Sequence, residues 1–264
     1  MALVLRDATD ADYSAFARLF PELAVEDPVP TREQFAAQML PKVVIVEDTN
    51  GPAGYAFWRT HGCAAHVVHV IVDPLARGRG LGRALMEDVR RRVLAQGCNR
   101  WFLNVKQDNS GAIRLYTRCG LATEQRGWAL RAEWSQLHSL PEPQSDVVAF
   151  TLAPEEDSSI AARFDETPEH LASLRSRAGV VLVGLREAGL IVGFAAFDPS
   201  FPGVRPVHVA RIALARRLFE SLRPHARHDH VHVTFERNQS LLEALTSLGA
   251  KTRHTFYRMG GARP

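Results

Sequence analysis

Apolar positions along the chain recur with two different spacings, which predict strands alternating with helices. Runs rich in β-branched and aromatic residues predict strands at residues 3–5, 43–47, 54–58, 64–72, 102–106 and 129–134. Apolar residues three and four positions apart predict helices at residues 9–20, 31–40, 81–96 and 110–118. The turn Thr49-Asn50-Gly51-Pro52 joins two of the strands into a hairpin. This order predicts an α/β fold with a mixed sheet.

The second half of the chain repeats this order of elements. The hairpin VVIVEDTNGPAGYAFW returns as VVLVGLREAGLIVGFAAF, RALMEDVR returns as RRLFESLR, and NSGAIRLYTRCG returns as NQSLLEALTSLG. The three matches come in the same order, which favours a duplication over chance likeness between α/β segments. The polar, proline-bearing stretch SQLHSLPEPQSD lies between the halves and is typical of a linker. We therefore expect one domain at residues 1–134, a linker at 135–146 and a second domain at 147–264.

Composition and charge exclude several classes of protein. The 264 residues are 46% hydrophobic and 23% charged, enough for the cores of two ordinary domains. A formal net charge of +3 is too small to indicate a nucleic-acid-binding protein. Three cysteines without metal-ligand spacing predict reduced thiols, as in a cytoplasmic protein. The N-terminal sequence MALVLRDATDADY carries acids where a signal peptide carries an apolar run. We expect a cytoplasmic protein with no bound metal, nucleic acid or membrane.

The stretch PLARGRGLGRALM, residues 74–86, joins a predicted strand to a predicted helix. A helix N-terminus presents unpaired N–H groups, and glycines allow a phosphate to approach the backbone closely. The arginines of the stretch add donors that suit phosphate. A Walker loop would need Gly-Lys-Ser/Thr, which is absent, and a Rossmann fingerprint would follow the first strand rather than the fourth. The stretch predicts a pyrophosphate cradle; the alternative is a glycine-rich connection with solvated arginines.

This stretch resembles the R/Q-x-x-G-x-G/A signature of the GCN5-related N-acetyltransferase (GNAT) family, where it holds the pyrophosphate of acetyl-CoA. The segment 109–120 resembles the N-x-x-A-x-x-L-Y-x-x-x-G segment of that family. The resemblance covers residues 3–134 and implies the acyl-CoA N-acyltransferase fold, here in two tandem domains. The cofactor-binding residues that it implies are Val70, Ile71, Val72, Arg77, Gly78, Arg79, Gly80, Leu81, Gly82, Arg83, Asn109 and Tyr116.

The resemblance implies an N-acetyltransferase that moves an acetyl group from acetyl-CoA to a primary amine by direct attack in a ternary complex. Tyr116 is then the general acid that protonates the coenzyme A thiolate; without the motif it reads as a core residue. Some family members place a glutamate base where this chain has Asn104, which cannot accept a proton. Others place a base on the fourth strand, here at His66, although a strand histidine is often only structural. Strict alternation places His66 on the same face as Val68, Val70 and Val72.

The second half lacks the residues that carry this chemistry. Ala213 and Ala215 stand where the first half has glycines, so that a Cβ would occupy the place of the phosphate, and Leu245 replaces Tyr116. We expect this half neither to bind coenzyme A nor to catalyse. Its basic and histidine-rich segment 223–232 reads as a solvated face, with an anion or metal site as the alternative.

The expected partners are acetyl-CoA and an amine-bearing acceptor, either a small molecule or a peptide, bound by a monomer or homodimer. The acids Glu22, Glu26 and Asp27, in a predicted loop, suggest a cationic acceptor. A second function remains open at this level, that of a non-catalytic sensor that binds acyl-CoA. Asn104 in place of a carboxylate favours the sensor, whereas an intact Tyr116 favours the enzyme.

Overall fold

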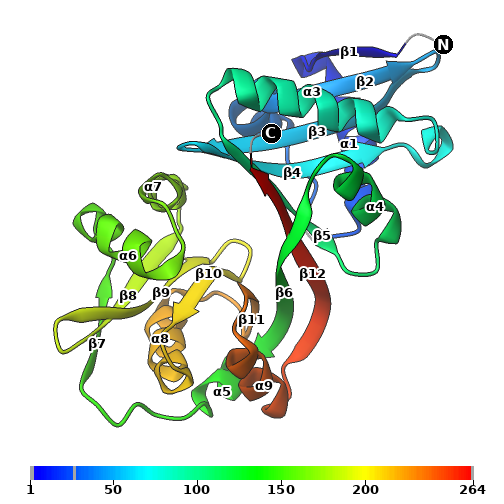
Figure 1. The fold of residues 1–264 in the computed structure, drawn as a ribbon. Coiled ribbons are helices and arrows are strands. Elements are labelled where there is room, and N and C mark those ends of the chain that lie inside the picture. Colours follow the sequence, from blue (N-terminus) through cyan, green and yellow to red (C-terminus); the bar gives the residue numbers. More distant parts are fainter. Residues whose placement is uncertain (1–2, 26–27, 263–264) are drawn as a thin grey trace. The chain divides into compact units, whose positions relative to one another are not determined.

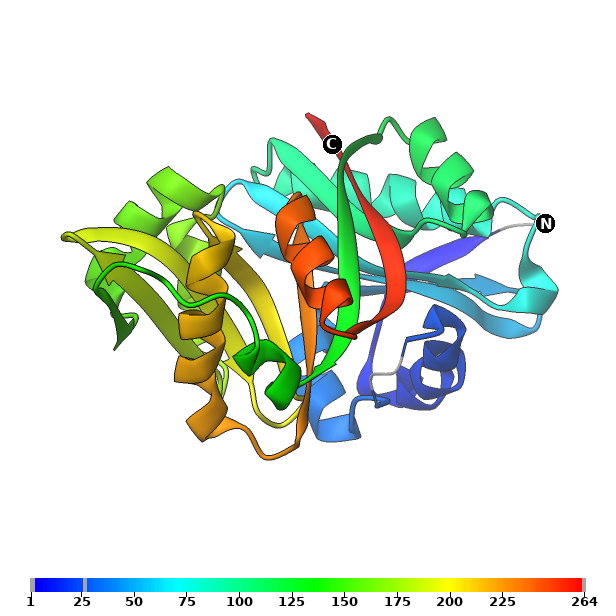
Figure 2. The same cartoon turned by 90° about the horizontal axis from the view of Figure 1, so that it is seen from below.

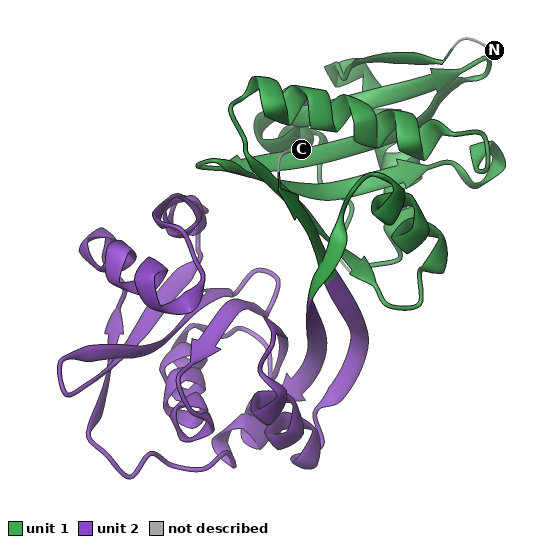
Figure 3. Ribbon diagram, viewed as in Figure 1, with its two compact units in different colours: residues 1–124, 258–264 green, residues 125–257 purple. Residues whose placement is uncertain are grey.

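The computed structural model describes residues 3–25 and 28–262, which form two compact units (Figures 1 and 3). Unit 1 comprises Met1–Glu124 and Arg258–Pro264, and unit 2 comprises Gln125–Tyr257. The strands are β1 (Val4–Asp7), β2 (Val43–Asp48), β3 (Gly51–His61), β4 (Ala64–Val72), β5 (Arg100–Lys106), β6 (Ala122–Glu133), β7 (Val147–Thr151), β8 (Val181–Glu187), β9 (Leu190–Asp198), β10 (Gly203–Val209), β11 (His230–Glu236) and β12 (Lys251–Ala262). The α-helices are α1 (Tyr13–Leu19), α2 (Arg32–Gln34), α3 (Leu81–Ala95), α4 (Ser110–Arg118), α5 (Trp134–His138), α6 (Asp157–Phe164), α7 (Pro168–Arg175), α8 (Ala215–Leu222) and α9 (Gln239–Ser247).

In unit 1 the strands follow the order β1-β2-β3-β4-β5, and the C-terminal end of β12 lies beside β5. Neighbours from β1 to β4 are antiparallel, whereas β4 and β5 are parallel and are connected through α3. Helix α3 covers one face of these strands, and α1 packs on the other (Figure 1). Buried aromatic residues fill the α1 side, including Phe16, Phe35, Tyr55 and Phe57.

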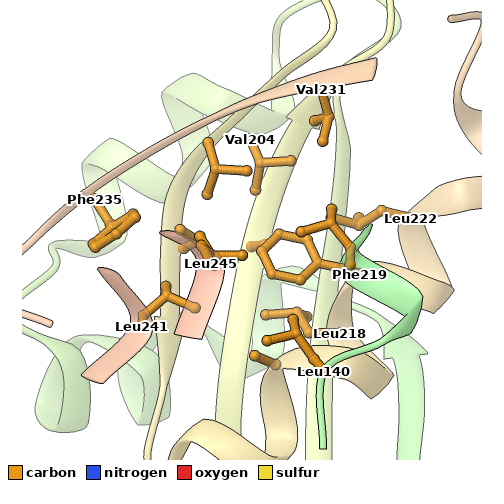
Figure 4. Close-up of a cluster of buried hydrophobic side chains, with 14 of the residues drawn as sticks. Leu140, Val204, Leu218, Phe219, Leu222, Val231, Phe235, Leu241 and Leu245 are labelled. Carbon is orange, nitrogen blue, oxygen red and sulfur yellow. The ribbon is translucent and has the colours of Figure 1, made fainter. Parts of the chain in front are cut away.

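In unit 2 the strand order is β12-β6-β11-β10-β9-β8-β7. Helix α8 lies on one face of the strands, and α6 and α7 lie on the other (Figure 2). Figure 4 shows the core beneath α8, where Leu218, Phe219 and Leu222 meet Val204, Val231 and other apolar side chains. The apolar stripe of α8 thus supplies a core of its own for this unit.

The two halves of the chain repeat the same local structure as well as the same element order. Asn109 caps α4 by accepting a hydrogen bond from the Ala112 backbone N–H, and Asn238 caps α9 in the same way. The glycines that follow these helices, Gly120 and Gly249, have φ angles of 88° and 90°, which favour glycine. The repeat predicted from sequence is therefore present in the fold.

Part of the last strand of each half belongs to the other half's unit. Strand β6 pairs with β11, with Glu133 opposite His230, and residues 258–262 of β12 belong to unit 1. The units therefore divide at residues 124 and 258 rather than at the predicted linker. Residues 135–146 lie inside unit 2, where Leu137 and Leu140 are buried, so the linker prediction is wrong. Leu137 and Leu140 hold this stretch against the core, although its polar and proline residues gave it the composition of a linker.

Candidate active site

The glycine-rich stretch forms an open left-handed turn at the start of α3. Gly78 and Gly80 have φ angles of 79° and 85°, and Gly80 is the N-cap of the helix. A Cβ added at either glycine would meet no atom within 4 Å, so the backbone is uncovered on this side. The N–H groups of the first helical turn, at residues 81–83, have no acceptor within a helix. The turn therefore has the backbone freedom and the donors that a pyrophosphate requires.

The third glycine has a different role. A Cβ at Gly82 would lie 3.1 Å from Cδ2 of Leu115 and 3.8 Å from Cγ2 of Val72. Gly82 thus allows α3, α4 and β4 to pack closely, and the expectation that a Cβ here would meet the phosphate is not supported. The packing also brings α4 against the base of the turn.

Each arginine of the stretch meets a carboxylate. Arg77 donates to Glu22 at 2.6 Å, Arg79 donates to Asp48 at 2.8 Å, and Arg83 donates to Glu87 at 2.7 Å. Asp48 is nearly buried, with 4% of its side chain exposed, so its pair holds Arg79 most firmly.

These pairs also bear on the acidic loop that suggested a cationic acceptor. The Glu22 carboxylate is bound to Arg77, so its charge is already matched. Glu26 and Asp27 lie outside the described residues. Among the described residues of the loop, Glu22 therefore gives no structural support for a cationic acceptor.

Strands β4 and β5 pair over only part of their length. The parallel register joins Ala64–Val67 to Arg100–Leu103, and β4 then continues to Val72 without pairing to β5. The register of β4 with β3 shifts between Val67 and His69, so Val68 is the extra residue of a β-bulge. The backbone N–H and C=O groups that β4 turns toward β5 beyond this point can bind a ligand.

The bulge changes which side chains of β4 share a face. His66 lies opposite Arg59, whereas Val70 lies opposite Ala56 on the alternate face of β3. Val72 lies opposite Gly54, again on that alternate face. The prediction that His66 shares a face with Val70 and Val72 is therefore wrong, because the extra residue reverses the alternation.

Two histidines lie on the α1 side of β4. The ring of His66 stacks on Phe102 with a centroid distance of 4.6 Å and an angle of 10°. His69 is enclosed by Phe20, Tyr55 and Phe57, and burial lowers its pKa to about 4. His69 is therefore a neutral imidazole at pH 7 that sequence reasoning did not choose. The β-bulge at Val68 determines which face of the sheet His69 lies on, and the pattern of apolar residues along β4 does not reveal this bulge.

Tyr116 lies on α4, immediately after the Leu115 that packs against Gly82. The side chain is 8% exposed, and burial raises the pKa of its phenol, so the hydroxyl keeps its proton at neutral pH. Asn109 uses its side-chain oxygen to cap α4 at 3.0 Å from the Ala112 nitrogen. Since Asn238 caps α9 in unit 2 likewise, helix capping by itself accounts for the asparagine.

Unit 2 has no comparable turn at the corresponding place in its described residues. A short 3₁₀ turn, Ile212–Leu214, leads directly into α8, whose N-cap Leu214 has a φ of −82°. Ala215 and Leu245, which replace Gly82 and Tyr116, are both fully buried in the core shown in Figure 4. The site geometry is thus found in unit 1, and its counterpart in unit 2 has become part of a core.

Comparison with known proteins agrees with this geometry. Residues 8–121 match the model of the acetyltransferase (GNAT) family. A stretch of 70 residues is 37% identical to the mycothiol acetyltransferase of Saccharopolyspora erythraea and covers 26% of this chain and 23% of that protein. The first half of the chain is therefore similar to acetyltransferases of the GNAT family.

Solved structures extend the likeness to the whole fold. A GCN5-related N-acetyltransferase from Sphaerobacter thermophilus superposes with a TM-score of 0.68 at 19% identity, covering 99% of this chain and 96% of that one. A tandem GNAT protein from the clavulanic acid biosynthesis pathway superposes with a TM-score of 0.60 at 15% identity, covering 100% and 99%. The chain has a tandem GNAT fold. Within residues 3–25 and 28–262, no helix is long and apolar enough to cross a membrane.

Proposed function

We propose that unit 1 transfers an acetyl group from acetyl-CoA to a primary amine. The observation that carries the proposal is the open turn at Gly78 and Gly80, placed at the N-terminus of α3 and next to the end of β4. The turn fits a pyrophosphate because it exposes backbone N–H groups where no side chain intrudes. The backbone of residues 70–72 would hold the pantetheine arm along the edge that β5 leaves.

Acetyl-CoA supplies an activated thioester, and the chain supplies the groups that handle charge and protons. The amine nitrogen attacks the thioester carbonyl, a C–N bond forms, and the C–S bond breaks. Val68, the extra residue of the bulge, has a backbone N–H outside the regular ladder and would stabilise the developing oxyanion. The buried hydroxyl of Tyr116 would protonate the departing thiolate.

The amine must lose a proton as it is acylated, and two histidines on β4 can accept it. We propose His66 as the base, and His69 is the second candidate because its ring is neutral at pH 7. A base whose pKa is about 4, as burial gives His69, would support activity down to mildly acidic pH.

The test is release of free thiol from acetyl-CoA in the presence of a panel of amines, with mass spectrometry of the products. We expect thiol and acetylated amine in equal amounts. The family match favours this reaction over the sensor function, in which acetyl-CoA would bind without turnover. Tight binding with no product for any amine would refute the transferase and support the sensor.

A further inference from the structure

A small pocket of unit 1 lies between α3, the C-terminal end of α4 and the start of β5. Its volume is about 120 Å³, which is room for several water molecules and so for one phosphate group. Met86 and Trp101 are buried, so the pocket has an apolar base. The residues that line it are Arg83, Met86, Glu87, Arg90, Trp101, Arg118 and Cys119.

The lining of this pocket carries more positive charge than the protein itself matches. Its cations are Arg83, Arg90 and Arg118, and Glu87 is a carboxylate among them. Arg83 donates to Glu87 at 2.7 Å. Within residues 3–25 and 28–262, the side chains of Arg90 and Arg118 form no ion pair or hydrogen bond. Two guanidinium groups at the pocket are therefore left without an anion.

The thiol of Cys119 reports the field inside the pocket. Burial raises the pKa of this thiol, and the charge of Glu87 raises it further. Arg83 and Arg90 act in the opposite direction, so both guanidinium groups lie close enough to stabilise a negative charge at the thiol. An anion bound in the pocket would be stabilised by the same two groups.

The internal repeat supplies an independent observation, because the second half carries the same row of charges at α8. The counterparts of Arg83, Glu87 and Arg90 are Arg216, Glu220 and Arg223. Arg216 binds Glu220 at 2.9 Å, and it also binds Glu142, from outside the helix, at 2.9 Å. Arg223 lies over the ring of Trp134 and 3.4 Å from Asp229. In unit 2 this row therefore holds carboxylates that the protein itself supplies.

We infer that the pocket of unit 1 binds a phosphate monoester, in the place that the Glu142 carboxylate has in unit 2. Two unmatched guanidinium groups suit an anion with a charge of about −1.5 to −2 at pH 7 and three acceptor oxygens. Arginine donates to two such oxygens at once through its planar fork. Among the described residues of unit 1, no carboxylate forms an ion pair with Arg90 or Arg118 and so occupies this place.

Two sources can supply the phosphate monoester. Coenzyme A carries one on its ribose, a single sugar ring away from the pyrophosphate that we propose for the open turn. Arg83 is the third residue of α3 after its N-cap Gly80, so the pocket begins in the helical turn that also carries the open turn. The other source is a free phosphorylated metabolite. The coenzyme A source rests on the proposed function, whereas the free source does not.

Calorimetry of the full chain with acetyl-CoA and with 3′-dephospho-acetyl-CoA tests the first source. The wild type should bind the dephospho compound about tenfold more weakly, because it lacks the charge-assisted hydrogen bonds. In the double variant Arg90→Gln/Arg118→Gln, acetyl-CoA should bind as weakly as the dephospho compound. The Kd of the dephospho compound should change less than twofold, which shows that the variant is folded. A preference for acetyl-CoA that persists in the double variant would refute this source.

Inorganic phosphate tests the pocket without the cofactor. Since Cys119 lines the pocket, bound phosphate should slow its alkylation by iodoacetamide severalfold, relative to chloride at equal ionic strength, as measured by mass spectrometry of peptides. Cys63 is exposed and outside the pocket lining, so it should react equally in both salts. Protection should disappear in Arg90→Gln/Arg118→Gln. Arg217→Gln is the matched control, since it removes one exposed arginine from α8 and should keep both the protection and the preference for acetyl-CoA.

The two assays together decide the inference. A preference for acetyl-CoA that the double variant loses supports the pocket with coenzyme A as its source. Protection by inorganic phosphate that the double variant loses, without such a preference, supports a free phosphorylated ligand. If no acetyl-CoA binds, the proposed function fails, and the alkylation assay still tests the pocket. The absence of both effects, or effects of equal size in the double variant, would overturn the inference and leave the transferase intact.

Discussion

The turn at Gly80 allows the stability cost of a substitution to be separated from its effect on acetyl-CoA binding. Gly80→Ala places a Cβ on a residue with a φ of 85°. The left-handed conformation costs an L-residue about 1–2 kcal/mol, and stiffening of the unfolded chain offsets about 0.4–1 kcal/mol of that. The added Cβ meets no protein atom within 4 Å, so no clash adds to the cost. The expected loss of folding free energy is about 1 kcal/mol.

Gly97 provides a matched control at the other end of the same helix. It follows α3 with a φ of 79°, and a Cβ there would also meet nothing within 4 Å. Fifteen residues of helix separate the two glycines, a distance of about 22 Å. Gly97→Ala should therefore cost the same folding free energy as Gly80→Ala without touching the turn.

The assay is thermal unfolding with and without acetyl-CoA. Without ligand, both variants should unfold about 2–4 °C below the wild type. At a hundredfold excess over Kd, ligand adds about 2.7 kcal/mol, which raises Tm by about 5–10 °C in the wild type and in Gly97→Ala. In Gly80→Ala this rise should disappear, because the methyl group lies where the pyrophosphate would be. A full rise in Gly80→Ala, or equal losses in both variants, would refute the assignment of the turn.

Four further predictions follow from the same geometry. Tyr116→Phe should lower kcat about 100-fold, while the Kd for acetyl-CoA, measured by calorimetry, should change little. An unchanged kcat would show that Tyr116 has only a structural role. His66→Gln should remove the acid limb of the pH–rate profile if His66 is the base; since burial lowers the pKa of His69 to about 4, a profile that falls only near pH 4 would assign the base to His69 instead. Calorimetry should give one acetyl-CoA per chain, since Ala213 lies outside the left-handed region and unit 2 has no open turn; two equivalent sites would contradict this account. A fragment ending at Ser145 should aggregate on gel filtration, since it lacks the strand that lies beside β5; a soluble, active fragment would refute this.

The sequence predicts well those features that local chemistry determines. The strand Ala64–Val72 and the helix Ser110–Arg118 match their predicted bounds, since a proline follows the one and Asn109 and Gly120 enclose the other. The repeat and the mixed α/β GNAT fold are also confirmed, and residues 8–121 match the GNAT family model. These features depend on apolar period, capping residues and motif spacing, all of which are local.

Features that depend on pairing across the sheet are not visible in the same way. The bulge at Val68 lies within a run that is apolar throughout, so one extra residue does not disturb the pattern. Its effect on the direction of Val70 and Val72 therefore could not be foreseen. Likewise, the sequence predicts the last strand of each half as a strand, but its residues do not indicate which other strand it pairs with. The role of Gly82 depends on the position of Leu115, which only the packed structure gives.

Because the last residues of β12 belong to unit 1, this unit cannot finish folding on the ribosome before unit 2 has been synthesised. Residues 258–262 complete the sheet of unit 1, yet they are translated after all of unit 2. Strand β5 can pair with β4 early, but its second neighbour, the end of β12, lies more than 150 residues further along the chain. Closing so large a loop is slow. During that wait the edge of β5 is open to pairing with other chains, a hazard that early release or pausing would prolong.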